Sequence, residues 1–165
     1  MKKKSTILFL LVFATTLFVT AFTFNFTQPI EKETEMEAVR FAIDNCIGWF
    51  KTKNVDLLLS IIADDSNFVE VQPSEKVVFG RAEFEKSIPI FMNDKFQYVR
   101  HELNDLKINI SESGTVAWFY CRLNDINTWD GKPASWENAR WTGVLEKRDG
   151  RWQMVQQHFS FPGKK

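Results

Sequence analysis

The order of the predicted elements indicates an α+β fold with its helices first and its strands second. Apolar residues recur every two to four positions in residues 35–51, which is typical of a helix. After Lys95 the pattern becomes extended and is interrupted by turn residues, which is typical of antiparallel strands. The chain has 165 residues and is 44% hydrophobic, enough for one domain with a sizeable core.

Three helices are expected before the main run of strands. The first covers residues 35–51, and the second covers residues 55–63 with Asp56 in its first turn, where the helix dipole favours an acid. The third covers residues 82–92, and Pro89 inside it should kink or shorten it because proline has no amide hydrogen to donate.

Alternating apolar residues and turn residues predict two short strands and then a four-strand antiparallel meander. A change of parity near Asn104 predicts a bulge in the first long strand, and Asp149-Gly150 predicts a tight hairpin turn before the last one. The predicted strands cover residues 66–72, 77–79, 96–110, 115–129, 135–147 and 151–161.

The first residues of the chain have the pattern of a secretion signal. Lys2, Lys3 and Lys4 precede an apolar run from Ile7 to about Phe22, and small residues suit cleavage after Ala21. We therefore expect a signal peptide over residues 1–21, a linker over residues 22–34 and a secreted or periplasmic mature protein. The alternative is an uncleaved N-terminal membrane anchor, although the run is shorter than the ~20 residues that span a bilayer.

Charge and cysteine content exclude several classes of function. Without the leader's three lysines, 18 basic residues face 21 acidic ones, which argues against nucleic-acid binding. Neither Cys46 nor Cys121 has metal-ligand spacing, and the two histidines cannot make a typical metal site alone, so no metal or cofactor is expected. The two cysteines are either a disulfide or two buried thiols.

Four segments resemble the SnoaL-like, or nuclear transport factor 2-like, superfamily. They are Leu59-Ser60-Ile61-Ile62-Ala63-Asp64-Asp65, Phe79-Gly80-Arg81 before a helix, Asp149-Gly150-Arg151-Trp152-Gln153-Met154-Val155, and His158-Phe159-Ser160. They occur in the family's order, and the resemblance covers residues 35–161. It implies a cone-shaped curved antiparallel sheet wrapped around three N-terminal helices, a conical pocket for a small molecule, and a homodimer.

Arg122 is the first candidate for a ligand anchor. Tyr120-Cys121-Arg122-Leu123 is similar to the association domain of calcium/calmodulin-dependent protein kinase, in which the matching arginine lines a pocket for small carboxylates. A guanidinium can bind two carboxylate oxygens at once, so an anionic ligand is expected, although a structural ion pair is an equal alternative. Trp118 and Tyr120 share the face of Arg122 and would form pocket walls.

Three further residues complete the predicted ligand-binding set. Resemblance to ketosteroid isomerase and to the kinase domain places Gln157 and Phe159 on the pocket side of the last strand and turns His158 outward. Arg140, on the preceding strand, falls near the same mouth if the hairpin register holds, and its alternative is a solvent-facing charge.

The catalytic groups of ketosteroid isomerase are absent from the matching positions. The tyrosine aligns with Cys46, the base with Val71 or Gln72, and the protonated aspartate with Thr142. If Gln72 faces the cavity, alternation places Glu70 there as well, as a single carboxylate base. His158 is the other candidate base.

These observations predict an exported domain that binds a small molecule in a conical pocket. The alternatives are a cofactor-free lyase or isomerase that uses Glu70 or His158, and a non-catalytic dimerisation module whose cavity is filled by its own aromatic side chains.

Overall fold

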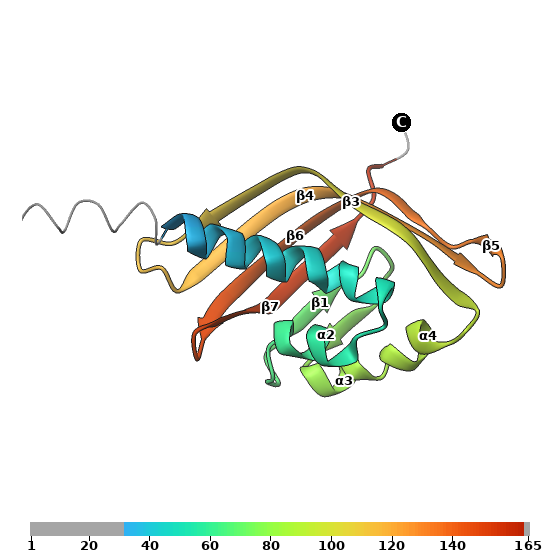
Figure 1. Ribbon diagram of the computed structural model, residues 1–165, viewed down its shortest axis with the longest axis horizontal. Helices are drawn as coiled ribbons and strands as arrows, with labels where there is room; N and C mark the ends of the chain where they lie inside the picture. The colour runs from blue at the N-terminus through green and yellow to red at the C-terminus, as the bar shows by residue number, and fades with distance from the viewer. Residues whose placement is uncertain (1–31, 164–165) are drawn as a thin grey trace, which may run out of the picture. The chain divides into compact units, whose positions relative to one another are not determined.

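The computed structural model describes residues 32–163. The chain divides into two units, Met1–Glu37 and Ala38–Lys165, and the second unit contains the sheet and the core described below (Figure 1). The predicted signal peptide, residues 1–21, lies outside the described residues, as does the predicted linker up to residue 31. Within residues 32–163, no helix has the length and apolar character needed to cross a membrane.

The N-terminal helix runs through residues 32–48, so it already includes the end of the predicted linker. It continues into a short 3-10 helix, η1 (Trp49–Lys51), and then into α2 (Val55–Ile61). Asn54 begins α2 because its side-chain oxygen accepts a hydrogen bond from the backbone amide of Leu57 at 3.0 Å. The two predicted helices are therefore present, and α2 ends two residues earlier than expected.

The predicted third helix is two short helices, α3 (Arg81–Glu85) and α4 (Ile88–Met92). Pro89 occupies the first turn of α4, where the missing amide hydrogen costs nothing. The chain therefore ends one helix before the proline and starts another at it, as the kink prediction required.

The strands form one seven-stranded sheet in the described part of the chain, in the order β2-β1-β7-β6-β4-β3, with β5 paired to β4. The long strands keep the predicted meander, but β1 pairs with β7 in parallel, so the sheet is mixed rather than wholly antiparallel. The bounds are β1 Val69–Val71, β2 Val77–Phe79, β3 Phe96–Ile110, β4 Val116–Trp129, β5 Lys132–Pro133, β6 Trp136–Arg148 and β7 Arg151–Ser160.

Several register shifts let the long strands curl around the helices (Figure 1). The predicted bulge near Asn104 is present: the β3–β4 register shifts between Asn104 and Lys107, and Asp105 has a left-handed φ of 55°. The β4–β6 register shifts between Leu123 and Asp125, and the β6–β7 register shifts between Val144 and Leu145.

Two of these shifts change which side chains share a face. Simple alternation places Trp136 and Trp141 on opposite faces of β6, but Asn138, with a φ of 55°, adds a residue, and both rings contact Phe159 at 5.3 Å between centroids. In β7 the shift brings Met154 opposite Leu145, onto the buried face with Phe159. Alternation alone predicts the reverse for Met154.

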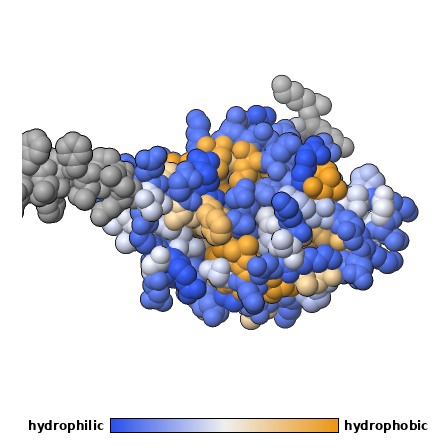
Figure 2. Space-filling model, viewed as in Figure 1, coloured by the Kyte–Doolittle hydropathy of each residue, from blue (hydrophilic) through white to orange (hydrophobic). Residues whose placement is uncertain are grey.

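The core lies between the concave face of the sheet and the helices. The N-terminal helix contributes Val39, Ile43 and Ile47 to this core, and the sheet contributes Phe119 and Trp141. Figure 2 shows that hydrophilic residues cover most of the face viewed in Figure 1, while hydrophobic residues reach the surface in separate patches. The structure therefore confirms the predicted α+β fold with a curled sheet around helices.

Candidate functional site

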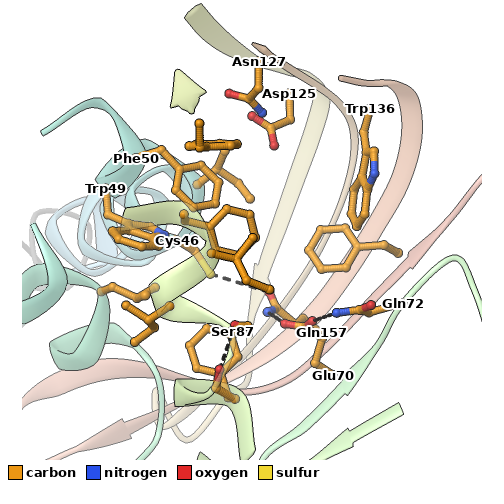
Figure 3. A pocket seen from close by; sticks show the side chains of 18 of the residues that line it. Cys46, Trp49, Phe50, Glu70, Gln72, Ser87, Asp125, Asn127, Trp136 and Gln157 are labelled. Carbon is orange, nitrogen blue, oxygen red and sulfur yellow. Dashed lines mark hydrogen bonds between the residues drawn. The ribbon is translucent and has the colours of Figure 1, made fainter. Parts of the chain in front are cut away.

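A cavity of about 310 Å³ lies between the helices and the concave face of the sheet (Figure 3). Its walls are mainly aromatic and aliphatic, and polar side chains enter it at a small number of places. Such a combination is typical of small-molecule sites. The aromatic wall residues are Trp49, Phe50, Phe84, Phe91, Phe96, Trp136 and Phe159.

The first polar cluster surrounds Glu70, a carboxylate that is only 8% exposed. The Gln72 amide donates to one of its oxygens at 2.8 Å, and the Gln157 amide donates to the other at 2.7 Å. The Cys46 thiol in turn donates to the side-chain amide oxygen of Gln157 at 3.6 Å. Each carboxylate oxygen of Glu70 thus accepts one hydrogen bond, and the two bonds fix the orientation of the carboxylate.

The sheet register explains why these side chains meet. Glu70 lies directly opposite Gln157 in the parallel β1–β7 pair, so the two side chains point to the same face. Gln72 follows Glu70 by two residues and shares its face. The parallel addition of β1 to the end of the meander therefore brings the carboxylate into the cavity.

The second polar cluster consists of Asp125 and Asn127, which are 9% and 3% exposed. Both follow Leu123 at two-residue spacing on β4 and so continue its buried face into the cavity. Burial raises the pKa of Asp125, and a hydrogen bond from Asn127 together with the nearby charge of His101 opposes that rise only in part. One oxygen of Asp125 and the Asn127 carbonyl oxygen have no hydrogen-bond partner among the described residues.

The cysteines are free thiols rather than a disulfide. Burial and the neighbouring charge of Glu70 raise the pKa of Cys46, and burial raises the pKa of Cys121 to about 12. Both thiols therefore stay protonated at neutral pH and are poor nucleophiles. Cys46 serves the cavity as a wall residue and a weak donor.

Three of the sequence-predicted site residues line the cavity: Glu70, Gln157 and Phe159. Gln72 also lines it, so the side-chain alternation that brings Glu70 inside is the one found. Whether these residues bind a ligand or react with it stays a prediction.

The other five predicted residues are on the outer face of the sheet or at its edge and do not line the cavity. They are Trp118, Tyr120, Arg122, Arg140 and His158, all exposed. Ala117, Phe119, Cys121 and Leu123 occupy the buried face of β4 instead. A ligand-binding role for Trp118, Tyr120, Arg122 and Arg140 remains a prediction, and it would need a site other than this cavity.

The two arginines have protein partners on the outer face. The Arg122 guanidinium pairs with the Asp105 carboxylate at 2.6 Å, which is the structural ion pair considered as its alternative. Arg140 donates to the backbone carbonyl of Phe161 at 2.8 Å. Both lie beside each other in the β4–β6 register, so two cations share this surface.

Sequence reasoning missed Asp125, Asn127 and Trp136. A signal for the first two was present, because they extend the alternation of Phe119, Cys121 and Leu123 and so place polar groups on an apolar face. Trp136 had no such signal, since only the added residue at Asn138 turns its ring toward Phe159.

The described residues contain no group of three or more His, Cys, Asp or Glu side chains that could hold a metal ion. The polar groups of the cavity wall are two carboxylates, three side-chain amides, the Cys46 thiol and the Ser87 hydroxyl, with exposed Lys76 as the one cationic lining residue in the described part of the chain. The arrangement can accept hydrogen bonds from a ligand and can hold a positive charge.

Solved structures with the same fold include proteins described as dehydratases. A proposed dehydratase of the NTF2-like family from Streptomyces avermitilis is 21% identical, with 81% of this chain and 99% of that chain covered and a TM-score of 0.66. A proposed scytalone dehydratase from Novosphingobium aromaticivorans is 13% identical, with coverage of 81% and 91% and a TM-score of 0.68.

A third similar structure is a proposed calcium/calmodulin-dependent protein kinase II association domain from Xanthomonas campestris. It is 22% identical, with 77% of this chain and 87% of that chain covered and a TM-score of 0.62. These likenesses establish the fold alone. No curated protein matches the chain. The family model described as the SnoaL-like domain matches residues 39–164, and the protein therefore belongs to the SnoaL-like domain family.

Proposed function

We propose that this protein is an exported domain that binds a small, largely apolar molecule in the cavity. The observation that carries the proposal is an apolar hollow of about 310 Å³ with oriented polar side chains at two separate places. A hollow of this size is at the lower end of the range of about 300–1,000 Å³ that is typical of small-molecule pockets.

The charges around the cavity support a ligand that is not an anion. The carboxylates of Glu70 and Asp125 enter it, whereas the two arginines first considered as anchors have partners outside it. A buried carboxylate repels a ligand carboxylate at short range, and little solvent is present to screen the repulsion. The expected anionic ligand is therefore replaced by a neutral or cationic one in this proposal.

Ligand binding is tested by thermal shift with matched tryptophan variants. A ligand at 100 times its Kd adds about 2.7 kcal/mol to the free energy of unfolding. Ala134 lines the cavity and is exposed, so Ala134→Trp should block the cavity without disturbing the core. Ala82→Trp, at an exposed position of α3 away from the cavity, is the control.

A panel of neutral and cationic aromatic compounds should raise the melting temperature of wild type and of Ala82→Trp, and not that of Ala134→Trp. An equal rise in Ala134→Trp would refute binding in the cavity. No rise with any compound in wild type would instead favour the non-catalytic module whose cavity is filled by its own side chains.

A second candidate function is a cofactor-free lyase or isomerase with Glu70 as the base. Glu70 favours it because its carboxylate is buried in the cavity and oriented by two amides, and two of the similar structures are described as dehydratases. One positioned carboxylate contributes about 10²–10⁴-fold to a rate. Glu70→Gln should remove turnover and keep ligand binding; turnover that persists in Glu70→Gln would exclude this mechanism.

We also propose that the protein is exported and dimeric. The basic and apolar leader supports export, and mass spectrometry of the mature N-terminus tests it: a chain beginning after Ala21 agrees, and an intact Met1 contradicts cleavage. Exposed Trp118 and Tyr120 on the outer sheet face support contact with a second copy.

Light scattering tests the dimer with two charge substitutions. Trp118→Glu on the outer sheet face should give monomers, whereas Phe79→Glu, at a 67% exposed position of β2, should leave the mass unchanged. A monomeric wild type would end the dimer proposal.

A further inference from the structure

The Asp125–Asn127 end of the cavity carries two acceptors without donors. One carboxylate oxygen of Asp125 and the amide oxygen of Asn127 are buried and have no hydrogen-bond partner among the described residues. Both residues line the cavity and are at least nine-tenths buried. Buried polar atoms are nearly always satisfied in folded proteins, so two adjacent exceptions that face one hollow mark a place where a bound molecule can supply donors.

The chemistry of the missing group follows from the two acceptors. A hydroxyl has one hydrogen and can satisfy only one of them, whereas an ammonium has three hydrogens and no acceptor of its own. A carboxylate on the ligand would add a third acceptor and a second negative charge. A primary amine in its charged form is therefore the simplest group that satisfies both oxygens.

The surroundings of Asp125 also suit a cation. Trp136 lies directly opposite Asp125 in the β4–β6 register, and its ring lines the cavity next to that of Phe159. Indole is the strongest of the side-chain rings in attracting a cation to its face. Glu70 adds negative charge elsewhere in the cavity, while Lys76 is exposed at its boundary.

The two polar clusters differ in whether they have acceptors left for a ligand. Each Glu70 oxygen already accepts a hydrogen bond from a glutamine amide, whereas Asp125 and Asn127 each keep an empty acceptor. In Figure 3 the two clusters lie apart, with Asp125 and Asn127 near the top and Glu70, Gln72 and Gln157 near the bottom of that view. The apolar body of a ligand would thus occupy the aromatic middle, with its polar end at Asp125.

We propose that the cavity takes a primary amine with an apolar body, and that its ammonium group binds Asp125 and Asn127 beside Trp136. This inference rests on the proposed ligand-binding function and names its substrate class. Asp125 supplies the charge, Asn127 the second acceptor, and Trp136 the ring.

Calorimetry with three matched probes tests the proposal on the full mature chain: 3-phenylpropylamine, 3-phenylpropanol and 3-phenylpropanoate. They share one apolar body and differ in charge. A hydrogen bond to a charged group contributes about 1.5–3 kcal/mol, so the amine should bind about tenfold or more tightly than the alcohol, and the propanoate should be the weakest.

Three variants locate the preference. Asp125→Asn keeps the shape of the side chain and should reduce the amine-over-alcohol preference to near unity, and Trp136→Leu should reduce it severalfold. Asp105→Asn, at the exposed partner of Arg122, should leave it unchanged. Circular dichroism of each variant confirms that it is folded before binding is measured.

The outcomes separate this inference from the function on which it rests. An alcohol that binds at least as tightly as the amine, or an amine preference that survives Asp125→Asn, overturns the amine assignment and leaves a ligand-binding cavity. Failure of all three probes to bind wild type, when they fit a hollow of this size, counts against both.

Discussion

The two faces of the β4–β6 strand pair differ in ways that alternation alone does not reveal. The concave face carries Phe119, Trp141 and Leu145, all nearly inaccessible, and leads into the cavity. The outer face carries Trp118, Tyr120 and Arg122, which combine large rings with a charge and resemble a binding site in sequence. On these strands, exposed aromatic residues beside an arginine mark the outer face of the sheet. Buried polar residues mark the face that lines the cavity.

The largest contrast between the faces is expected from two tryptophans on neighbouring strands. Trp141→Ala removes a fully buried ring that stacks on Phe159 and meets Phe119 edge-on, and it should cost about 3–5 kcal/mol of unfolding free energy. Trp118→Ala, where the side chain is 47% exposed, should cost about 1 kcal/mol or less. Urea unfolding at low protein concentration measures both, and equal losses would contradict the assignment of faces.

The next effect concerns Gly143, where β6 packs most closely on its neighbours. A Cβ added there would lie 2.6 Å from a Phe119 ring carbon and 2.9 Å from the Gln156 carbonyl oxygen. Gly143→Ala should therefore destabilise the protein by about 1–3 kcal/mol. Combining it with Phe119→Leu should recover only part of the loss, because the backbone contact remains. Full recovery would show that the Phe119 side chain alone prevents a larger residue at position 143.

A pH-dependent effect distinguishes Asp125 from the outer-face carboxylates. Burial holds the pKa of Asp125 above its unfolded value, so the folded state binds its proton more tightly. This contribution to stability is fully present below the unfolded pKa and is lost as pH rises through the raised one. Asp125→Asn should remove that decline and stabilise the ligand-free protein at pH 7. Parallel stability curves for the two proteins between pH 3 and pH 8 would refute it.

The smallest effect is expected at Arg122. Its ion pair with Asp105 is exposed, and such pairs contribute about 0.2–1 kcal/mol. Arg122→Ala should change the urea midpoint slightly, reduce that change further at high salt, and leave ligand affinity in the cavity unchanged. A marked loss of affinity in Arg122→Ala would show that a second site exists on the outer face and would restore this arginine as an anchor.

The order of the helices and strands can be predicted from the sequence because the spacing of apolar residues and the turn residues are local signals. Pro89 and the Asp149-Gly150 turn mark a helix break and a hairpin from their own backbone chemistry. Which face of β4 is buried is a different matter, since both faces of the segment from Val116 to Leu123 are apolar. Only packing against the helices decides it.

The placement of several site residues depends on pairing and register that the sequence alone does not show. Glu70 enters the cavity because β1 adds in parallel to β7, a pairing between residues far apart in the chain. Trp136 turns inward because of one extra residue near Asn138. Asp125 could have been identified from its place on an apolar face, and a polar residue that continues a buried alternation is the more reliable marker of a cavity.

The two free thiols have an experimental consequence. Cys46 borders the cavity, whereas Cys121 lies within the sheet core, and both are shielded from reagents in the folded chain. The rates at which a maleimide labels them under native conditions would therefore time two separate openings of the molecule. A ligand bound in the cavity should slow the labelling of Cys46 much more than that of Cys121.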